Sequence, residues 1–116
     1  GLSGSELRAA LEASGMEVFL FSGALDHTPA GLYGHVDRGR PLLVMITVDG
    51  GRFHYALFTG YDPPAGNVFL VDPRRGRMVL PSAAFDRLWE PADRFTLLCT
   101  PTRSAGPAGP ADDRTP

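Results

Sequence analysis

The sequence predicts an α+β domain in which two helices come first, an antiparallel sheet of about five to six strands follows, and one helix comes late. Three observations predict this class. Helix signals occupy residues 3–15 and 28–39 and return only after Pro81. Between them, short apolar segments alternate with turns rich in Gly, Pro and Asp, which is typical of strands joined by hairpins. A length of 116 residues is enough for one domain and not for two.

The first two helices are predicted from their end signals. Ser3 followed by Glu6 is the pattern of a capping box, and Gly15 is expected to end that helix. Thr28 as the N-cap and Pro29 as the first helical residue predict a second helix that ends near residue 39.

The strands are predicted from composition and from the turns between them. Residues 42–48 form a continuous apolar run, the pattern of a strand covered on both faces. Ser82 is expected to cap the late helix, with Trp89 anchoring it to the sheet. The predicted strands are 17–21, 42–48, 52–61, 67–71, 78–80 and 95–100.

Charge and composition exclude several classes of partner. The formal net charge is -2, so neither nucleic acid nor an anionic membrane surface is expected to bind. No apolar run approaches the roughly 18 residues that a membrane span needs. Residues 1–101 are predicted to form one folded domain. Residues 102–116, rich in Pro, Gly and charge, are predicted to be a disordered tail.

One histidine and one aspartate are predicted to meet across a hairpin. Side chains alternate between faces along a strand, so His54, Ala56 and Phe58 share one face. If the turn centres near Pro63, residue 54 pairs with residue 72, and the Cβ atoms of His54 and Asp72 lie roughly 5 Å apart. A one-residue slip would separate the two side chains.

An imidazole beside a carboxylate is the arrangement of a general base and its orienting group. The carboxylate fixes the tautomer and stabilises the imidazolium that forms when a thiol is deprotonated. The competing interpretation is a structural histidine at a strand start, next to an Asp72–Pro73 turn.

An ordered set of short motifs resembles the bacteriocin-processing peptidase family of the papain-like clan, whose members remove double-glycine leader peptides. The set extends over roughly residues 2–101 and consists of Gly39-Arg40-Pro41-Leu42-Leu43-Val44, His54-Tyr55, Gly60-Tyr61-Asp62, Val71-Asp72-Pro73 with Gly76, and Phe85 with Trp89. The resemblance implies a bacterial cysteine peptidase in which His54 and Asp72 are the catalytic pair. It also implies a peptide substrate or leader peptide as partner, and Tyr55 is a candidate for lining the substrate groove.

In that family a nucleophilic Cys and an oxyanion-stabilising Gln lie near the start of the domain, ahead of the region matched here. This sequence contains no Gln, and its single cysteine is Cys99. The chain is therefore expected to be the C-terminal half of such a domain, inactive alone, with a preceding segment or a complementary chain supplying the missing groups. The alternative is a degenerate peptidase-like module that binds peptides without cleaving them.

Other candidate residues favour ordinary interpretations. Cys99 sits in a predicted closing strand, where a thiol behaves as a small inert hydrophobe. His27 and His35 are eight residues apart and match no compact metal-ligand spacing, so no metal and no cofactor is expected. Arg74 and Arg75 follow the candidate Asp72 and are expected to be solvated, with contact to an acidic peptide as the alternative.

Overall fold

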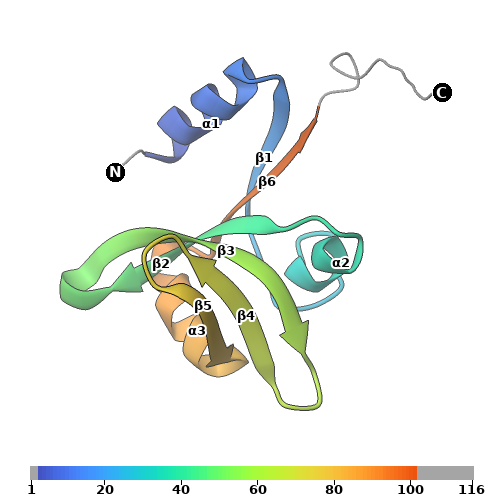
Figure 1. The fold of residues 1–116 in the computed structure, drawn as a ribbon, viewed down its shortest axis with the longest axis vertical. Helices are drawn as coiled ribbons and strands as arrows, with labels where there is room; N and C mark the ends of the chain where they lie inside the picture. Colours follow the sequence, from blue (N-terminus) through green and yellow to red (C-terminus); the bar gives the residue numbers. More distant parts are fainter. Residues whose placement is uncertain (1–2, 102–116) are drawn as a thin grey trace. The chain divides into compact units, whose positions relative to one another are not determined.

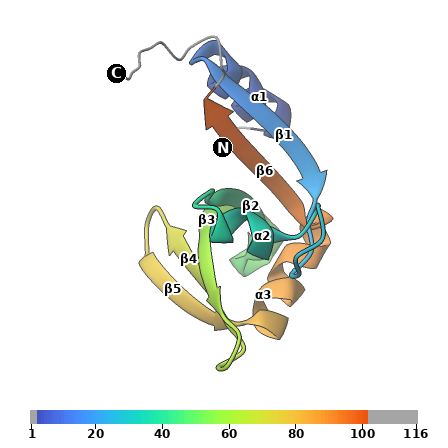
Figure 2. The same ribbon diagram turned by 90° about the vertical axis from the view of Figure 1, so that its right-hand side faces the viewer.

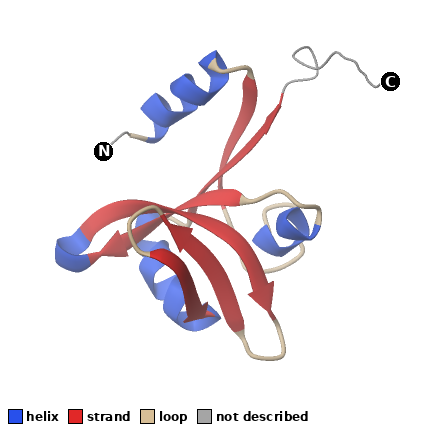
Figure 3. Cartoon of the chain, in the orientation of Figure 1, coloured by secondary structure: helices blue, strands red, loops and turns tan. Residues whose placement is uncertain are grey.

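The computed structural model describes residues 3–101, so the predicted tail 102–116 lies outside the described residues. Residues 3–101 contain six strands, three α-helices and two short 3-10 helices, and Figure 3 distinguishes helices, strands and loops by colour. In chain order they are α1 (Gly4–Ala13), β1 (Met16–Ser22), α2 (Leu32–Asp37), β2 (Leu42–Val48), η1 (Asp49–Gly51), β3 (Arg52–Asp62), β4 (Asn67–Asp72), β5 (Gly76–Pro81), α3 (Ser82–Trp89), η2 (Glu90–Ala92) and β6 (Phe95–Pro101). This confirms the predicted α+β class, with two helices early and one late.

The six strands form one sheet in the order β1-β6-β2-β3-β4-β5. Strands β2 to β5 are a meander of antiparallel hairpins, as the sequence predicts (Figure 1). The last strand returns to pair with β2, and β1 lies beside it with its arrowhead at the opposite end (Figure 2). Among the described residues, no helix is long and apolar enough to cross a membrane.

The chain divides into two compact units. The smaller contains α1, the first part of β1 through Phe19 and the end of β6 from Cys99 onward. The larger, Leu20–Leu98, contains the meander, α2 and α3. It holds every residue of the candidate site described below.

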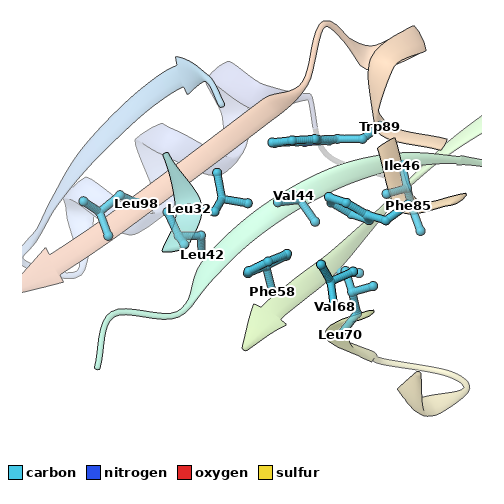
Figure 4. Packing of buried hydrophobic residues seen from close by; sticks show 11 residues of the cluster. Leu32, Leu42, Val44, Ile46, Phe58, Val68, Leu70, Phe85, Trp89 and Leu98 are labelled. Atoms are coloured by element: carbon cyan, nitrogen blue, oxygen red, sulfur yellow. The ribbon is translucent and has the colours of Figure 1, made fainter. Parts of the chain in front are cut away.

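The core of the larger unit lies on one face of the meander, between the sheet and its helices. Helix α3 packs against β2, β4 and β5, and α2 packs against β2 and β3. Alternate residues of the strands point toward them, and Trp89 and Phe85 of α3 lie against these residues (Figure 4). The buried cluster is Leu32, Leu42, Val44, Ile46, Ala56, Phe58, Val68, Leu70, Phe85, Trp89 and Leu98.

The helix ends agree with the sequence at α1 and differ at α2 and α3. The Ser3–Glu6 capping box forms, with both reciprocal hydrogen bonds present. Helix α2, however, begins at Leu32 with Gly31 as its N-cap, so Thr28 and Pro29 do not start it. The Asp26 carboxylate accepts hydrogen bonds from the amide and hydroxyl of Thr28 and holds this segment in a turn.

Ser82 is the first residue of α3 and not its cap. Pro81 occupies the N-cap position, and no side chain caps the helix there. The amide of Ser82 donates to the carbonyl oxygen of Gly66 at 2.9 Å, so the β3–β4 turn satisfies one of the amides that have no partner within the helix.

Candidate functional site

The β3–β4 hairpin brings His54 and Asp72 together, although its register differs from the expected one. Leu57 pairs with Val71 and Phe58 with Leu70, which shifts the predicted pairing by two residues. His54 is therefore a diagonal neighbour of Asp72 and not its direct partner. A two-residue shift leaves every side chain on its original face, so both still point to the side of the sheet that carries the core.

The shift has two sources, the position of the β3–β4 turn and a β-bulge. Next to the turn Asp62 pairs with Asn67, which is three residues from the predicted register, and the bulge reduces this shift to two residues before His54. Phe58 pairs with Leu70 but Gly60 pairs with Phe69, which leaves Thr59 as an extra residue in β3. Glycine next to this position is the only signal in the sequence for the irregularity.

The His54 ring and the Asp72 carboxylate form a close and partly buried contact. His54 Nε2 lies 2.8 Å from Asp72 Oδ2. The Asp72 side chain is 2% exposed and that of His54 is 26% exposed. A buried carboxylate is costly unless its oxygens are hydrogen-bonded, so the contacts of Asp72 explain how it is tolerated.

The second oxygen of Asp72 is held by the turn that follows β4. The main-chain amides of Arg74 and Arg75 donate to Oδ1 at 2.7 and 3.1 Å. The Arg74 amide holds the pKa of the Asp72 carboxyl below its ordinary value of 3.8, and the Arg75 amide and His54 act in the same direction, against the effect of burial. The carboxylate is thus anionic at neutral pH.

His54 occupies the rim of the core face. On β2 its partner is the buried Ile46. With Nε2 directed at the carboxylate, Nδ1 is the nitrogen left for another group. An anionic carboxylate at Nε2 favours the tautomer in which this nitrogen carries the proton and Nδ1 has the lone pair. Chemically, the arrangement presents a base at Nδ1.

Tyr55 lies on the opposite face of β3 from His54, because successive side chains alternate. It pairs with Met45 of β2 and makes an edge-on contact with Phe95, with ring centroids 6.2 Å apart. Any contact of Tyr55 with a substrate is therefore on the face of the sheet opposite the His54–Asp72 pair.

Cys99 has the environment of a structural thiol. It belongs to β6 and is partly buried. Burial raises the pKa of its thiol above the ordinary value of 9.0, which disfavours the reactive thiolate.

A second cluster with a His–Asp contact, not predicted from the sequence as a unit, lies at the other end of β3. His27 Nε2 lies 3.0 Å from Asp37 Oδ2, and the Tyr61 hydroxyl donates to the same carboxylate at 3.0 Å. The Tyr61 and Tyr33 rings stack with centroids 3.9 Å apart. The bulge explains the cluster, because the extra Thr59 turns Tyr61 to the side where α2 lies. The described residues include no group of three or more metal-ligating side chains.

The two charged side chains after Asp72 lie in solvent. Arg74 and Arg75 are exposed in the turn, as is Arg77 at the start of β5. On the face of the sheet away from the core, Arg77 borders a shallow groove of about 450 Å³ lined by Thr59, Phe69, Leu70, Val71, Met78 and Val79.

Comparison with known proteins finds a structure of similar fold and no sequence match. Neither a protein-family model nor a curated protein sequence matches this chain. Among solved structures, it is similar to the peptidase domain of Streptococcus ComA, a bi-functional ABC transporter involved in quorum sensing, with a TM-score of 0.70 and 15% sequence identity. The match covers 88% of this chain and 69% of that one. The chain therefore has the α+β fold of a peptidase domain.

Proposed function

We propose that the chain carries the general base and the orienting carboxylate of a papain-like cysteine peptidase of the leader-peptide-processing type. The observation that carries this proposal is the 2.8 Å contact between His54 Nε2 and Asp72 Oδ2, in which the carboxylate is 2% exposed. The fold similarity to a peptidase domain and the motif order of the sequence support it independently.

In this role Nδ1 of His54 takes the proton of a cysteine thiol as the thiolate attacks the peptide carbonyl. The imidazolium formed is stabilised by Asp72 and then returns its proton to the leaving amine. Water, deprotonated by the same nitrogen, releases the acyl group. Asp72 remains ionised throughout, which fits the lowered pKa of its carboxyl.

The proposal assigns the nucleophilic Cys and the oxyanion-hole Gln to a segment or chain outside these 116 residues. The sequence has no Gln, and its one thiol is that of Cys99, whose pKa is raised. The nucleophile is expected at the start of a helix, where the macrodipole lowers a thiol pKa.

His54–Asp72 is a better base and orienter than His27–Asp37. The side chains of the latter pair are 61% and 48% exposed, whereas Asp72 is buried. Water competes for exposed hydrogen bonds, so an exposed carboxylate orients an imidazole weakly. The exposed pair also shares its carboxylate with Tyr61.

The test begins with the coding sequence upstream of codon 1, which is expected to encode a Gln a few residues before a Cys. The chain extended through that Cys is then assayed on a peptide with a double-glycine cleavage site. We expect cleavage, a loss of at least about 10³-fold in His54→Ala, and a loss of about 10²–10⁴-fold in Asp72→Asn.

His27→Ala is the matched control, because it breaks the other His–Asp contact and should leave the rate unchanged. An in-frame stop codon upstream with no such Cys, together with no activity on mixing with a Cys-bearing partner chain, would rule the proposal out.

One observation favours a second candidate, a peptidase-like module that binds peptides without cleaving them. Strand β5 is an edge strand of the sheet, and the groove beside it is lined mainly by apolar side chains. An extended peptide can pair with such an edge and place alternate side chains in a groove.

Titration of a fluorescent leader-type peptide into the 116-residue chain tests this candidate. Saturable binding that Val79→Asp abolishes is expected, because Val79 is 59% exposed and lines the groove. Arg87→Asp, on the exposed side of α3, is the control for added negative charge. Binding that does not saturate, or that both variants reduce equally, counts against the module.

A further inference from the structure

The Oδ1 oxygen of Asp72 is held by main-chain donors and not by side chains. Its Oδ1 accepts only the amides of Arg74 and Arg75 among the described residues, at 2.7 and 3.1 Å. Its Oδ2 is then directed at His54 Nε2. Amides are donors only, so they fix the rotation of the carboxylate without exchanging a proton with it.

The position of those two amides depends on a tight turn. Asp72 pairs with Gly76 across the base of the turn, which leaves Pro73, Arg74 and Arg75 to close it. Gly76 has a φ of 78°, in the left-handed region that favours glycine. A Cβ at this position would meet nothing within 4 Å. Glycine is therefore required here by backbone conformation and not by lack of space.

We infer that the β4–β5 turn is a positioning element, in which Gly76 holds the Arg74 and Arg75 amides on Asp72 and thereby sets the tautomer of His54. The inference rests on the proposed role of His54 as base, because that role requires the lone pair at Nδ1. Neither arginine side chain takes part. Gly76 touches no reacting atom and acts through Asp72.

The glycine immediately before β4 offers a matched control. Gly66, in the β3–β4 turn, has a φ of 71° and also has nothing within 4 Å of a Cβ. Alanine at either position therefore imposes the same kind of backbone strain. Only the turn at Gly76 is connected to Asp72.

The experiment measures the His54 tautomer from the ¹⁵N shifts of its ring in the 116-residue chain, at alkaline pH where imidazole is neutral. His54→Gln assigns the signals, since the chain has three histidines. Wild type is expected to show the Nε2–H tautomer alone. Gly76→Ala should give a mixture with the Nδ1–H form, whereas Gly66→Ala and Arg74→Ala should match wild type.

Gly76→Asn is expected to restore the single tautomer, because asparagine tolerates the left-handed region. If Gly76→Ala does not fold, amide hydrogen exchange of Arg74 and Arg75 in the wild-type chain tests the inference instead. We expect both amides to be protected well above the level of a turn without hydrogen bonds. An unchanged tautomer in folded Gly76→Ala, or unprotected amides, overturns the inference.

No nucleophile or substrate enters this measurement. A failure here would leave the proposed peptidase role standing. Conversely, an extended chain with no activity but an intact single tautomer would sink the proposed role alone.

Discussion

Trp89 donates its indole Nε1–H to the carbonyl oxygen of Phe95 at 3.0 Å. The bond joins the end of α3 to the first residue of β6 and is partly buried. The Trp89 side chain is fully buried, and the centroid of its ring lies 4.9 Å from the centroid of the Phe85 ring. The contact connects the late helix to the strand that returns beside β2.

Trp89→Phe is expected to lower the free energy of unfolding by about 2–4 kcal/mol, since it leaves the Phe95 carbonyl without its donor and opens a cavity. Chemical denaturation measures the change. Arg87→Ala, at an exposed position of the same helix, should stay within about 0.5 kcal/mol of wild type. Equal effects of the two substitutions would contradict this account of the core.

Two glycines near α2 are expected to respond to alanine in opposite directions. A Cβ at Gly31 would collide with the main chain and carboxylate of Asp26, whereas a Cβ at Gly34 would meet nothing within 4 Å. We expect Gly31→Ala to destabilise by about 1–3 kcal/mol. Gly34→Ala should stabilise by about 0.5–1 kcal/mol through helix propensity. Thermal unfolding of both variants gives the comparison, and a stabilised Gly31→Ala is the opposing result.

Asp72 is expected to make stability depend on acid pH. Because the pKa of its carboxyl is lowered in the folded state, the group contributes stability above its unfolded pKa of about 3.9, and this is lost as pH falls through the folded value. The difference in unfolding free energy between wild type and Asp72→Asn should therefore be constant at neutral pH and shrink below about pH 4. Asp49→Asn removes a charge from an exposed turn and is the control. A difference that grows on acidification would refute the assignment.

The thiol of Cys99 is expected to react slowly. Its raised pKa lowers the thiolate fraction at neutral pH, so alkylation by iodoacetamide should be slower than that of free cysteine. The rate should increase once denaturant exposes the strand. If Cys99 in the folded chain reacts as fast as free cysteine, the partial burial of its thiol in β6 is contradicted.

The parts of the fold that follow from local chemistry could be read from the sequence. The capping box at Ser3 and the apolar run of β2 are examples, and β2 has the predicted bounds 42–48. The start of α2 could not be predicted, because the Asp26 carboxylate accepts a hydrogen bond from the Thr28 amide and Ala24 forms a β-bridge with Gly31. These contacts lie within the loop 24–31, and a Thr-Pro pair alone does not reveal them.

The pairing of His54 with Asp72 could be predicted by face but not by register. Strand periodicity fixes the face, whereas the register depends on the position of the turn after Asp62 and on a bulge that the sequence marks only with Gly60. The error was two residues, which preserves the face. The His27–Asp37–Tyr61 cluster was missed for the same reason, because without the bulge Tyr61 would point the other way.

The extra residue at Thr59 also makes the two ends of β3 independent. A bulge places one extra residue in a strand, so the alternation of faces on the Tyr61 side is set separately from the alternation on the His54 side. Substitutions around Tyr61 can therefore change that end of the hairpin while His54 stays on the same face as Asp72.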